Sequence, residues 1–561
     1  MSNSALAAAR NFIEHEKQFH LGFLPTEQSS PLTKNLDKEF ARGSIYGVAN
    51  LQSVDRNVLA MARKIFASAE FAKLVAAGEK VIRSGGKVVF SGCGATGRLS
   101  ILLECMYRDC CANTPELAQY RNNVFSIMTG GDYALVRSVE FFEDYQSFGR
   151  QQVKELDMTD RDMLVAITEG GETSSVLGTV FEALDRGCQT FLMFNNPADL
   201  LAEHLERSRQ AICDERVCVL DLYCGPMALA GSTRMQATTS EQLIAGAALE
   251  SIVLKLLGNA LPDYARLFET LLDDLESPAA RQGIADYIDF EANCYKNKGL
   301  LTYFADDYLL DIFTDTTERS PTFMLPPFRK YDDKVSPRPW TFVKNPLRTT
   351  DEVWSHGMNR ELRCLDWSTD LYLAMGAPEK VLTNPPLIQA RELKKFLVGS
   401  EDIADRISGG CDAAVLVTLS TGRTNAELKT VMQDIQKQLP CSKHLSIGCS
   451  CGDFAVPCKL EHSPLEIMSH MAVKLVLNTA STGIMAVLGR VTGNWMSYVD
   501  VSNKKLIDRA TRLISEIGEM DYEKACIMLF EAIEELAEST AASDERVSTV
   551  QYVLNKIKKQ Q

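Results

Sequence analysis

A short apolar run that opens into a glycine-rich loop constrains this chain more than any other feature. Residues 87–98 read KVVFSGCGATGR, in which Val88, Val89 and Phe90 precede the loop and a helix is expected from about Leu99. Glycines let the backbone turn sharply and approach a ligand, and a helix N-terminus presents unpaired N–H groups with a partial positive charge. A strand, a small-residue loop and a helix start in this order predict an anion site, most often for phosphate.

The loop matches neither common nucleotide motif. GxxxxGK[ST] is absent, and Gly92, Gly94 and Gly97 fit GxGxxG without the acidic residue expected about 20 residues further on. A plain tight turn is therefore the alternative interpretation of these glycines. If the loop binds phosphate, Ser91 and Thr96 add hydroxyl donors to the backbone N–H groups.

A second stretch has the same organisation. Residues 163–167, MLVAI, read as a buried strand and are followed by the hydroxyl-rich loop TEGGETSS at 168–175 and by a helix from about Val176. The carboxyl ends of two parallel strands would line one crevice at the edge of a sheet. Thr173 and Ser174 could bind phosphate in that crevice or simply cap the helix, since both roles use the same geometry.

Further segments carry a family resemblance. Residues 26–37 read TEQSSPLTKNLD, residues 225–235 read GPMALAGSTRM, and residues 474–483 and 488–494 read KLVLNTASTG and LGRVTGN. The chain resembles the phosphosugar-binding SIS family, and within it the branch of the N-acetylmuramic acid 6-phosphate etherases and the glucokinase regulatory proteins. The corresponding etherase motifs are TExxNPxSxxID, GxGTSGR, GPExxxGSTRM and KLVLNxxSTGxMxxLGxVxGN, and the blocks occur here in family order.

The resemblance implies an α/β fold of two tandem SIS domains, each a three-layer αβα unit with a mainly parallel, flavodoxin-like sheet, and a small helical C-terminal cap. A chain of 561 residues is long enough for two or three domains. The expected divisions are an N-terminal helical segment at 1–55, a first domain with the phosphosugar site at 56–258, a second, degenerate domain at 259–500, and the cap at 501–561.

Strands are expected wherever short apolar runs alternate with helical patterns. In the first domain they are predicted at 87–91, 124–128, 163–167, 189–194 and 217–221, with helices such as 240–257 between or after them. In the second domain the candidates are 300–304, 371–375, 413–419 and 443–447. Residues 321–354, rich in Pro, Lys, Arg and aromatic residues, are expected to form a long irregular excursion.

The resemblance also assigns two glutamates. Residues 303–309, YFADDYL, replace the family phosphate loop in the second half, and their two aspartates would repel phosphate. Glu318 aligns with the first catalytic glutamate of the etherases, whereas Met106 holds that place in the first half. Residues 129–144 are similar to the family segment AGG…EGxED and place Glu143 on the second functional glutamate. The resemblance thus implies one composite site that Glu143 and Glu318 face from the two halves of one chain.

Departures from the etherase pattern bear on the ligand. Glu172 stands where the etherase loop ASGRTPYV has arginine, which makes the loop closer to the SGET loop of the SIS sugar isomerases. Gln236 replaces the lysine of GSTRMK, and Lys474 matches the family lysine before LVLN. Lys474 is expected to supply the remaining cation, with an exposed helix lysine as the alternative, while Arg98 and Arg234 are expected to be structural. The expected phosphate ligands are Ser91, Gly92, Gly94, Thr96, Thr173, Ser174 and Ser232.

Charge and composition limit the partners. The net charge of −15 argues against nucleic acid or anionic membrane, so local donors must hold any anionic ligand. No signal-peptide pattern and no run of 18 apolar residues is visible, so a cytoplasmic location is expected. The 16 cysteines are expected to be reduced thiols. The densest group, Cys441, Cys449, Cys451 and Cys458, lacks paired CxxC units, and no metal or cofactor is expected.

Three functions remain open at this stage. The first is a sugar 6-phosphate binding protein resembling the glucokinase regulatory proteins, with a sugar kinase as partner. The second is an etherase-like carbon–oxygen lyase that releases lactate from an N-acetylmuramate-type 6-phosphate, in which one of Glu143 and Glu318 takes a proton and the other helps the leaving oxygen. The third is an aldose–ketose isomerase, which only the GGETSS loop supports.

Overall fold

The computed structural model describes residues 3–139, 141–501, 503–538 and 547–560. Within this part of the chain, two five-stranded sheets are built entirely of parallel pairs. The first sheet has the order β2-β1-β3-β4-β5 and the second the order β7-β6-β8-β9-β10, so each half repeats the flavodoxin-like order 2-1-3-4-5. The prediction of two tandem α/β units is confirmed.

The strands of the two five-stranded sheets are β1 (Val88–Gly92), β2 (Val124–Met128), β3 (Met163–Ile167), β4 (Gln189–Phe194), β5 (Val217–Asp221), β6 (Leu301–Phe304), β7 (Thr341–Lys344), β8 (Ala413–Leu419), β9 (Cys441–Ile447) and β10 (Phe454–Val456).

Helices cover both faces of the first sheet, because its strands are apolar on both sides. Val88 and Phe90 of β1 pack into one hydrophobic cluster, and Val89, which points the other way, packs into a second. The first cluster includes α5 (Ala69–Arg83), α6 (Ala95–Asn113) and α11 (Gln236–Leu257). The second cluster includes α7 (Gln146–Glu155) and α8 (Ser174–Asp185), which completes the three layers.

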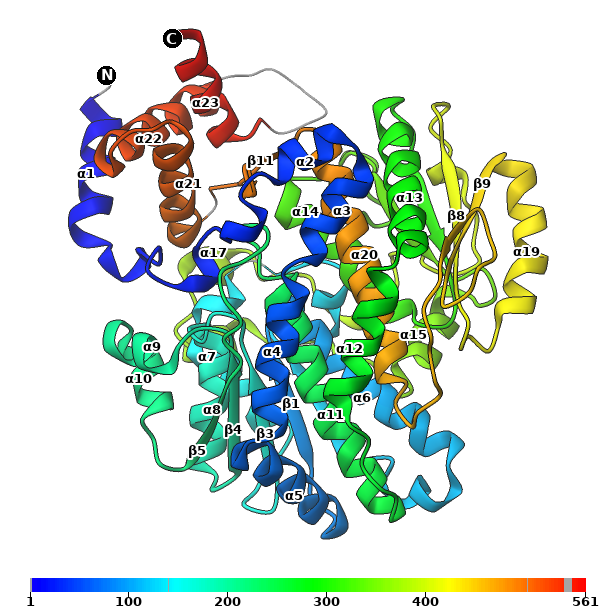
Figure 1. Cartoon of the computed structure of the whole chain (residues 1–561). Coiled ribbons are helices and arrows are strands. Elements are labelled where there is room, and N and C mark those ends of the chain that lie inside the picture. Colours follow the sequence, from blue (N-terminus) through cyan, green and yellow to red (C-terminus); the bar gives the residue numbers. More distant parts are fainter. Residues whose placement is uncertain (1–2, 140, 502, 539–546, 561) are drawn as a thin grey trace.

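The two halves share one hydrophobic core. The larger cluster runs from the first sheet through α11 to α13 (Pro278–Lys296), α14 (Leu309–Phe323) and α20 (Ile467–Val487) of the second half. In Figure 1, α20 lies between the helices of the first half and those of the second. Contacts of α20 with α11, α13 and α14 make it the helix that joins the halves.

The C-terminal helices form the expected cap together with the start of the chain. The cap consists of α21 (Lys504–Ile517), α22 (Tyr522–Glu538) and α23 (Thr549–Gln560), and α1 (Asn3–His15) packs beside α22 (Figure 1). Glu27 anchors α21 to the N-terminal segment, because its carboxylate accepts hydrogen bonds from Arg509 at 2.6 and 3.0 Å and from Arg512 at 2.9 Å. Glu27 is 3% exposed, so these ion pairs hold the cap from inside the fold.

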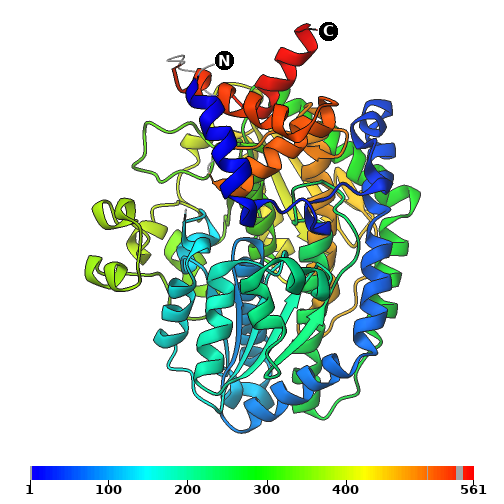
Figure 2. The same ribbon diagram turned by 90° about the vertical axis from the view of Figure 1, so that its left-hand side faces the viewer.

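All five strands predicted for the first half are confirmed to within one residue. In the second half the predicted strand at 371–375 is wrong. Residues 371–374 belong to helix α16 (Thr369–Ala374), and Met375 is its C-cap. The Ser368 hydroxyl caps the N-terminus of α16 by accepting from the Leu371 N–H at 3.2 Å. The segment around α16 and α17 (Glu379–Thr383) projects from the body as the yellow-green helices at the left of Figure 2.

Two strands of the second five-stranded sheet lie outside the predictions. β7 (Thr341–Lys344) lies inside the predicted irregular excursion at 321–354 and pairs with β6, and β10 (Phe454–Val456) pairs with β9. Both are short, four and three residues long, so they carry little pattern of their own and depend on the neighbouring strand.

None of the helices in the described ranges combines the length and the apolar character that a bilayer crossing requires.

Candidate functional site

A cavity of about 590 Å³ lies where the first half, the second half and the cap meet. Its wall contains the loops after β1 and β2 and the C-terminal part of α14 with the segment that follows. Residues before and at the start of the cap complete it: Met496, Val499, Asp500, Asn503 and Leu506. Glu143 of the first half and Glu318 of the second half both line it. The structure therefore brings the two predicted glutamates to one cavity.

The glycine loop after β1 brings the start of α6 to this cavity. Cys93 and Gly94 line the wall, and Gly94 has φ +57° and ψ −123°, a conformation that favours glycine. A Cβ atom at Gly92 would come within 2.4 Å of the backbone of Thr96, so the tight fold of the loop requires glycine there. The partial positive charge at the α6 N-terminus therefore lies at the cavity.

The predicted hydroxyl ligands of this loop are used within the fold. Ser91 is 1% exposed and its Oγ lies 2.9 Å from Oγ1 of Thr179 on α8. The Thr96 hydroxyl accepts from the Cys93 N–H at 3.0 Å and donates to the Cys93 carbonyl at 2.9 Å. Of the predicted phosphate ligands, Gly94 lines the cavity among the described residues. The lining does not include the other predicted ligand-binding residues, which are Ser91, Gly92, Thr96, Thr173, Ser174, Ser232 and Lys474.

The second predicted loop places an acidic side chain next to the cap. Thr173 precedes α8, and its Oγ1 accepts from the Thr168 hydroxyl at 3.1 Å. The carboxylate of Glu172 lies 2.7 Å from Lys505 Nζ and 2.6 Å from Arg207 Nη2. Burial alone would raise the pKa of Glu172, but the charges and hydrogen bonds of Lys505 and Arg207 lower it to about 2. Oε1 of Glu172 also lies over its own loop, 3.6 Å from the position that a Cβ atom on Gly170 would occupy.

Lys505 is a candidate site residue that the sequence analysis missed. It lies in the first turn of α21, which begins beside the cavity, since Asn503 and Leu506 line it. Burial favours the neutral amine, yet the carboxylates of Glu172 and Glu27 raise the pKa of Lys505. Residue 505 lies 333 positions from Glu172, so no local motif signals this pairing.

Glu143 lies in a short 3-10 turn, Phe142–Asp144, that follows the left-handed residue Phe141 (φ +69°). Its side chain is open to the cavity, but the surrounding protein removes water from it and raises its pKa. Lys505 opposes this effect, and the charges of Asp144 and Glu172 add to it. Glu140 of the same family segment lies outside the described residues.

Glu318 is oriented by a buried arginine. Its Oε1 forms an ion pair with Arg98 of α6, and Arg98 is 1% exposed. The same guanidinium donates to the carbonyls of Leu135 at 3.0 Å and Ala134 at 3.1 Å. Arg98 thus has the structural role expected from the sequence, and it positions Glu318 across the boundary between the halves.

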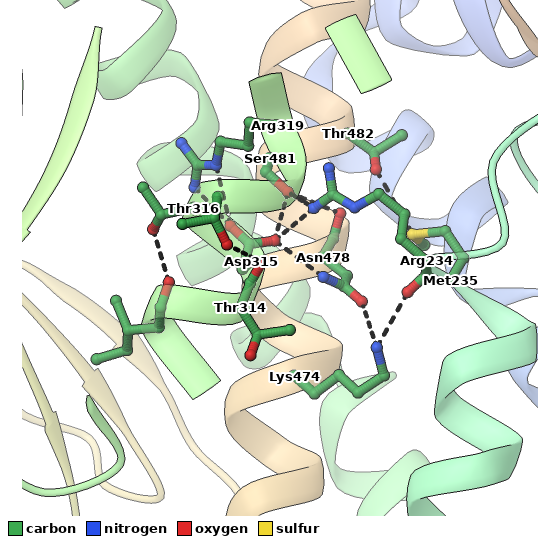
Figure 3. Close-up of polar contacts among 12 residues, drawn as sticks. Arg234, Met235, Thr314, Asp315, Thr316, Arg319, Lys474, Asn478, Ser481 and Thr482 are labelled. Carbon is green, nitrogen blue, oxygen red and sulfur yellow. Dashed lines mark hydrogen bonds and ion pairs between the residues drawn. The ribbon is translucent and has the colours of Figure 1, made fainter. Parts of the chain in front are cut away.

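A buried polar network behind the cavity fixes α14, which carries Glu318 (Figure 3). The Asp315 carboxylate accepts from Arg234 and from Ser481, from Asn478 at 2.9 Å and from Arg319 at 2.9 Å. Arg234 comes from the GSTRM loop of the first half, while Ser481 and Asn478 come from α20. Arg234 is therefore structural, as expected, and the network connects the two halves.

Lys474 belongs to the same network rather than to the cavity wall. Its Nζ donates to the Arg234 carbonyl at 3.0 Å and to Asn478 Oδ1 at 2.9 Å (Figure 3). It also donates to Thr238 Oγ1 at 2.6 Å. Burial, with the nearby charge of Arg234, lowers the pKa of Lys474 to about 8. The alternative of an exposed helix lysine is wrong, because Lys474 is 8% exposed. Its expected role as the cation of the ligand site stays a prediction.

Three further polar residues lie in or beside the predicted loops. Glu169, in the loop after β3, has its pKa raised to about 7, first by burial and also by the charges of Glu318 and Glu143. Gln236 braces the GPMALAGSTRM loop, because its amide donates to the Pro226 carbonyl at 2.9 Å and accepts from the Ala228 N–H. Ser232, in the same loop, is 6% exposed and donates its N–H to the Leu229 carbonyl at 3.0 Å.

The fold and the cavity define a tandem α/β protein whose two halves both line one cavity, and comparison with known proteins identifies its family. Residues 70–184 match the model of the glucokinase regulatory protein N-terminal SIS domain. The chain is 33% identical over 257 residues to the N-acetylmuramic acid 6-phosphate etherase of Trichormus variabilis and 34% identical over 259 residues to that of Nostoc sp.. Each alignment covers 45% of this chain and 76% of the etherase. Among solved structures, the C-terminal domain of glucosamine-fructose-6-phosphate aminotransferase from Francisella tularensis has a TM-score of 0.41 and 9% identity, over 76% of this chain and 94% of that one.

The chain belongs to the SIS family, in the branch of the N-acetylmuramic acid 6-phosphate etherases and the glucokinase regulatory proteins. Its function is accordingly related to sugar phosphates.

Proposed function

We propose that this chain binds one sugar 6-phosphate in the cavity between its halves and acts as a phosphosugar-responsive binding protein, with a sugar kinase as its partner. The observation that carries the proposal is that Glu143 and Glu318, from different halves, line the same cavity as Gly94 at the start of α6. A carboxylate pair suits sugar hydroxyls, and a helix N-terminus suits phosphate.

The charges around the cavity support this mode of binding. The N-terminus of α6 provides backbone N–H groups and a partial positive charge, and Lys505 at the start of α21, ion-paired with Glu172, lies near the second loop. The overall charge of the chain is negative, so these local groups must hold the phosphate. Because Lys505 belongs to the cap, a bound phosphate would connect the cap to the first half.

The contacts of Glu318 suit a hydrogen-bond acceptor rather than the proton donor of an etherase. Arg98 holds Oε1 of Glu318, which leaves Oε2 to accept a hydrogen bond from a sugar hydroxyl. An etherase needs a group that gives a proton to the departing lactate oxygen. A carboxylate oriented by a buried guanidinium suits the acceptor role better than the donor role.

A second candidate function is the etherase reaction, which the raised pKa values of Glu143 and Glu169 favour. In that reaction a base removes the proton next to a carbonyl, and the carbon–oxygen bond to lactate breaks as the departing oxygen gains a proton. A carboxyl group whose pKa is raised above its ordinary value is a stronger base and can exchange protons with a substrate. Glu143 would be the proton acceptor of this reaction, since it lines the cavity.

The experiment that tests the proposal is a thermal-shift series with sugar 6-phosphates in which lactate is measured in the same wells. A ligand present at 100 times its Kd stabilises by about 2.7 kcal/mol. Stabilisation by a hexose 6-phosphate without chemistry is the expected result, and Glu318→Gln should weaken it. Asp185→Asn, which changes an exposed carboxylate on α8, is the matched control.

Other outcomes of the same series separate the alternatives. Lactate released from N-acetylmuramic acid 6-phosphate would establish the etherase reaction, and interconversion of ketose and aldose would establish the isomerase. The proposal fails if no sugar 6-phosphate changes the melting temperature. The kinase partner is tested separately, by ligand-dependent binding of a purified sugar kinase to the immobilised protein.

A further inference from the structure

Two cysteines lie together at the carboxyl edge of the second sheet, away from the cavity. Cys449 and Cys451 follow β9, the strand that corresponds to β4 of the first sheet in the repeated strand order. In sheets of this topology, ligands and reactive groups gather at the carboxyl ends of the strands. Gly448 (φ +87°) and Gly452 (φ +97°) flank the pair, and their left-handed conformations turn the chain sharply around it.

The geometry of the pair is unusually close. The two Sγ atoms lie 2.8 Å apart, compared with about 2.05 Å in a disulfide bond. Ser446, a fully buried residue of β9, holds the turn: its hydroxyl donates to the Cys451 carbonyl, and the Cys449 Sγ lies 3.3 Å from the Ser446 Oγ. Small movements within this short turn would bring the sulfur atoms to bonding distance.

Accessibility and pKa distinguish these thiols from the buried cysteines of the core. Cys451 is exposed and Cys449 is half-buried. Hydrogen bonds with Cys451 and Ser446 outweigh burial and lower the pKa of Cys449, whereas the thiol of Cys449 raises the pKa of Cys451. By contrast, burial raises the pKa of core cysteines to between about 11 and about 12, as it does for Cys105, Cys110, Cys111, Cys188, Cys224, Cys294, Cys458 and Cys526.

We propose that Cys449 and Cys451 form a redox-active dithiol, which a low-molecular-weight disulfide such as oxidised glutathione converts to an intramolecular disulfide. Cys449 is the attacking thiolate and Cys451 the resolving thiol. The dithiol is a site of reversible covalent modification that is independent of the phosphosugar cavity.

The reaction balances without any further reagent. The Cys449 thiolate attacks one sulfur of the small disulfide, whose S–S bond breaks, and one small thiolate leaves and takes up a proton. Cys451 then loses its proton, and its sulfur attacks Cys449 in the mixed disulfide, releasing the second small thiol. The protein loses two electrons and two protons, and the small disulfide gains both as two thiols.

The test uses the reduced full-length protein, oxidised glutathione at pH 7.5 and alkylation before tryptic mass spectrometry. The tryptic peptide 444–459 contains Cys449, Cys451 and Cys458. The expected result is the loss of two alkylatable thiols and of two hydrogen atoms from this peptide, with Cys458 still reduced. Treatment with dithiothreitol should restore both thiols.

Single substitutions assign the roles. Cys451→Ser should trap a stable glutathione adduct on Cys449, whereas Cys449→Ser should react no faster than the exposed thiol of Cys213. Cys213→Ser is the matched control and should leave disulfide formation in the 444–459 peptide unchanged. The proposal is overturned if wild-type protein keeps both thiols, or if glutathione adducts form on Cys213 and Cys411 as fast as on Cys449.

Discussion

Replacing Asp315 by asparagine is expected to loosen the connection between the two halves. Asp315 is 2% exposed and balances Arg234 and Arg319, which are equally buried. Asparagine keeps the shape of the side chain and removes its charge. Arg319 then keeps its ion pair with Glu291, whereas Arg234 loses its ion pair with residue 315. Removing one partner of a buried ion pair costs about 3–5 kcal/mol of unfolding free energy.

The size of the effect on melting temperature follows from chain length. An unfolding entropy of about 2.1 cal/mol/K per residue gives about 1.2 kcal/mol/K for 561 residues that unfold together. A loss of about 3–5 kcal/mol therefore lowers the melting temperature by about 2.5–4 °C. Scanning calorimetry measures this shift, and a larger decrease confined to one transition would mean that the halves unfold separately.

An exposed ion pair supplies the matched control. Asp273, 63% exposed, pairs with Arg56 at 2.7 Å. Surface pairs contribute about 0–1 kcal/mol, so Asp273→Asn should change the melting temperature by less than about 1 °C. The reasoning is refuted if Asp315→Asn melts within 1 °C of the wild-type protein, because the network would then contribute no more than a surface pair.

Three further predictions concern the loops and the acidic groups around the cavity. Glu172→Gln should free Lys505, and the variant should bind inorganic phosphate and sugar 6-phosphates about tenfold more tightly in calorimetric titrations. A tenfold gain is about what one charge-assisted hydrogen bond contributes, and unchanged or weaker binding would contradict this prediction. The pKa of Glu169 is raised to about 7 in the folded state, so its stabilising contribution is present at pH 4 and lost as pH rises through 7. Glu169→Gln should accordingly gain melting temperature relative to wild type between pH 5 and pH 8, and a constant difference would show that the pKa is not raised. Gly92→Ala should lower the free energy of unfolding by more than about 1 kcal/mol, because the new Cβ atom would lie 2.4 Å from the Thr96 backbone. Gly85→Ala is the control: its Cβ would have open space, so only the smaller cost of a positive φ is expected.

The first sheet was predictable because continuous apolar runs, bounded by turn residues, form its strands. The segment at 371–375 shows where this signal ends. Its apolar residues suit a strand or a short helix equally well, and the cap provided by Ser368 decides for the helix. β7 forms because β6 offers it a partner, with Thr302 opposite Phe342, and a four-residue strand has no comparable local signal.

The site was predictable as far as motifs reach. Glu143 and Glu318 follow from the family resemblance and the glycine loop from its own residue pattern, and the structure brings all three to one cavity. The contacts of Lys505 were not predictable, because its pairing with Glu172 depends on how the cap packs against the first half. Strand alternation predicts that Ser91 points to the face opposite Phe90. It does not predict that the Thr179 hydroxyl forms a hydrogen bond with the Ser91 hydroxyl on that face.

We propose that the two halves of the chain share one phosphosugar site. The measurement that tests it most directly is the binding stoichiometry of a sugar 6-phosphate, determined by titration calorimetry for the wild-type protein and for Glu143→Gln and Glu318→Gln. We predict one ligand per chain, and a loss of affinity of at least about tenfold from either substitution, although the two residues belong to different halves. Two ligands per chain, or a substitution in one half that leaves binding unchanged, would contradict the shared site.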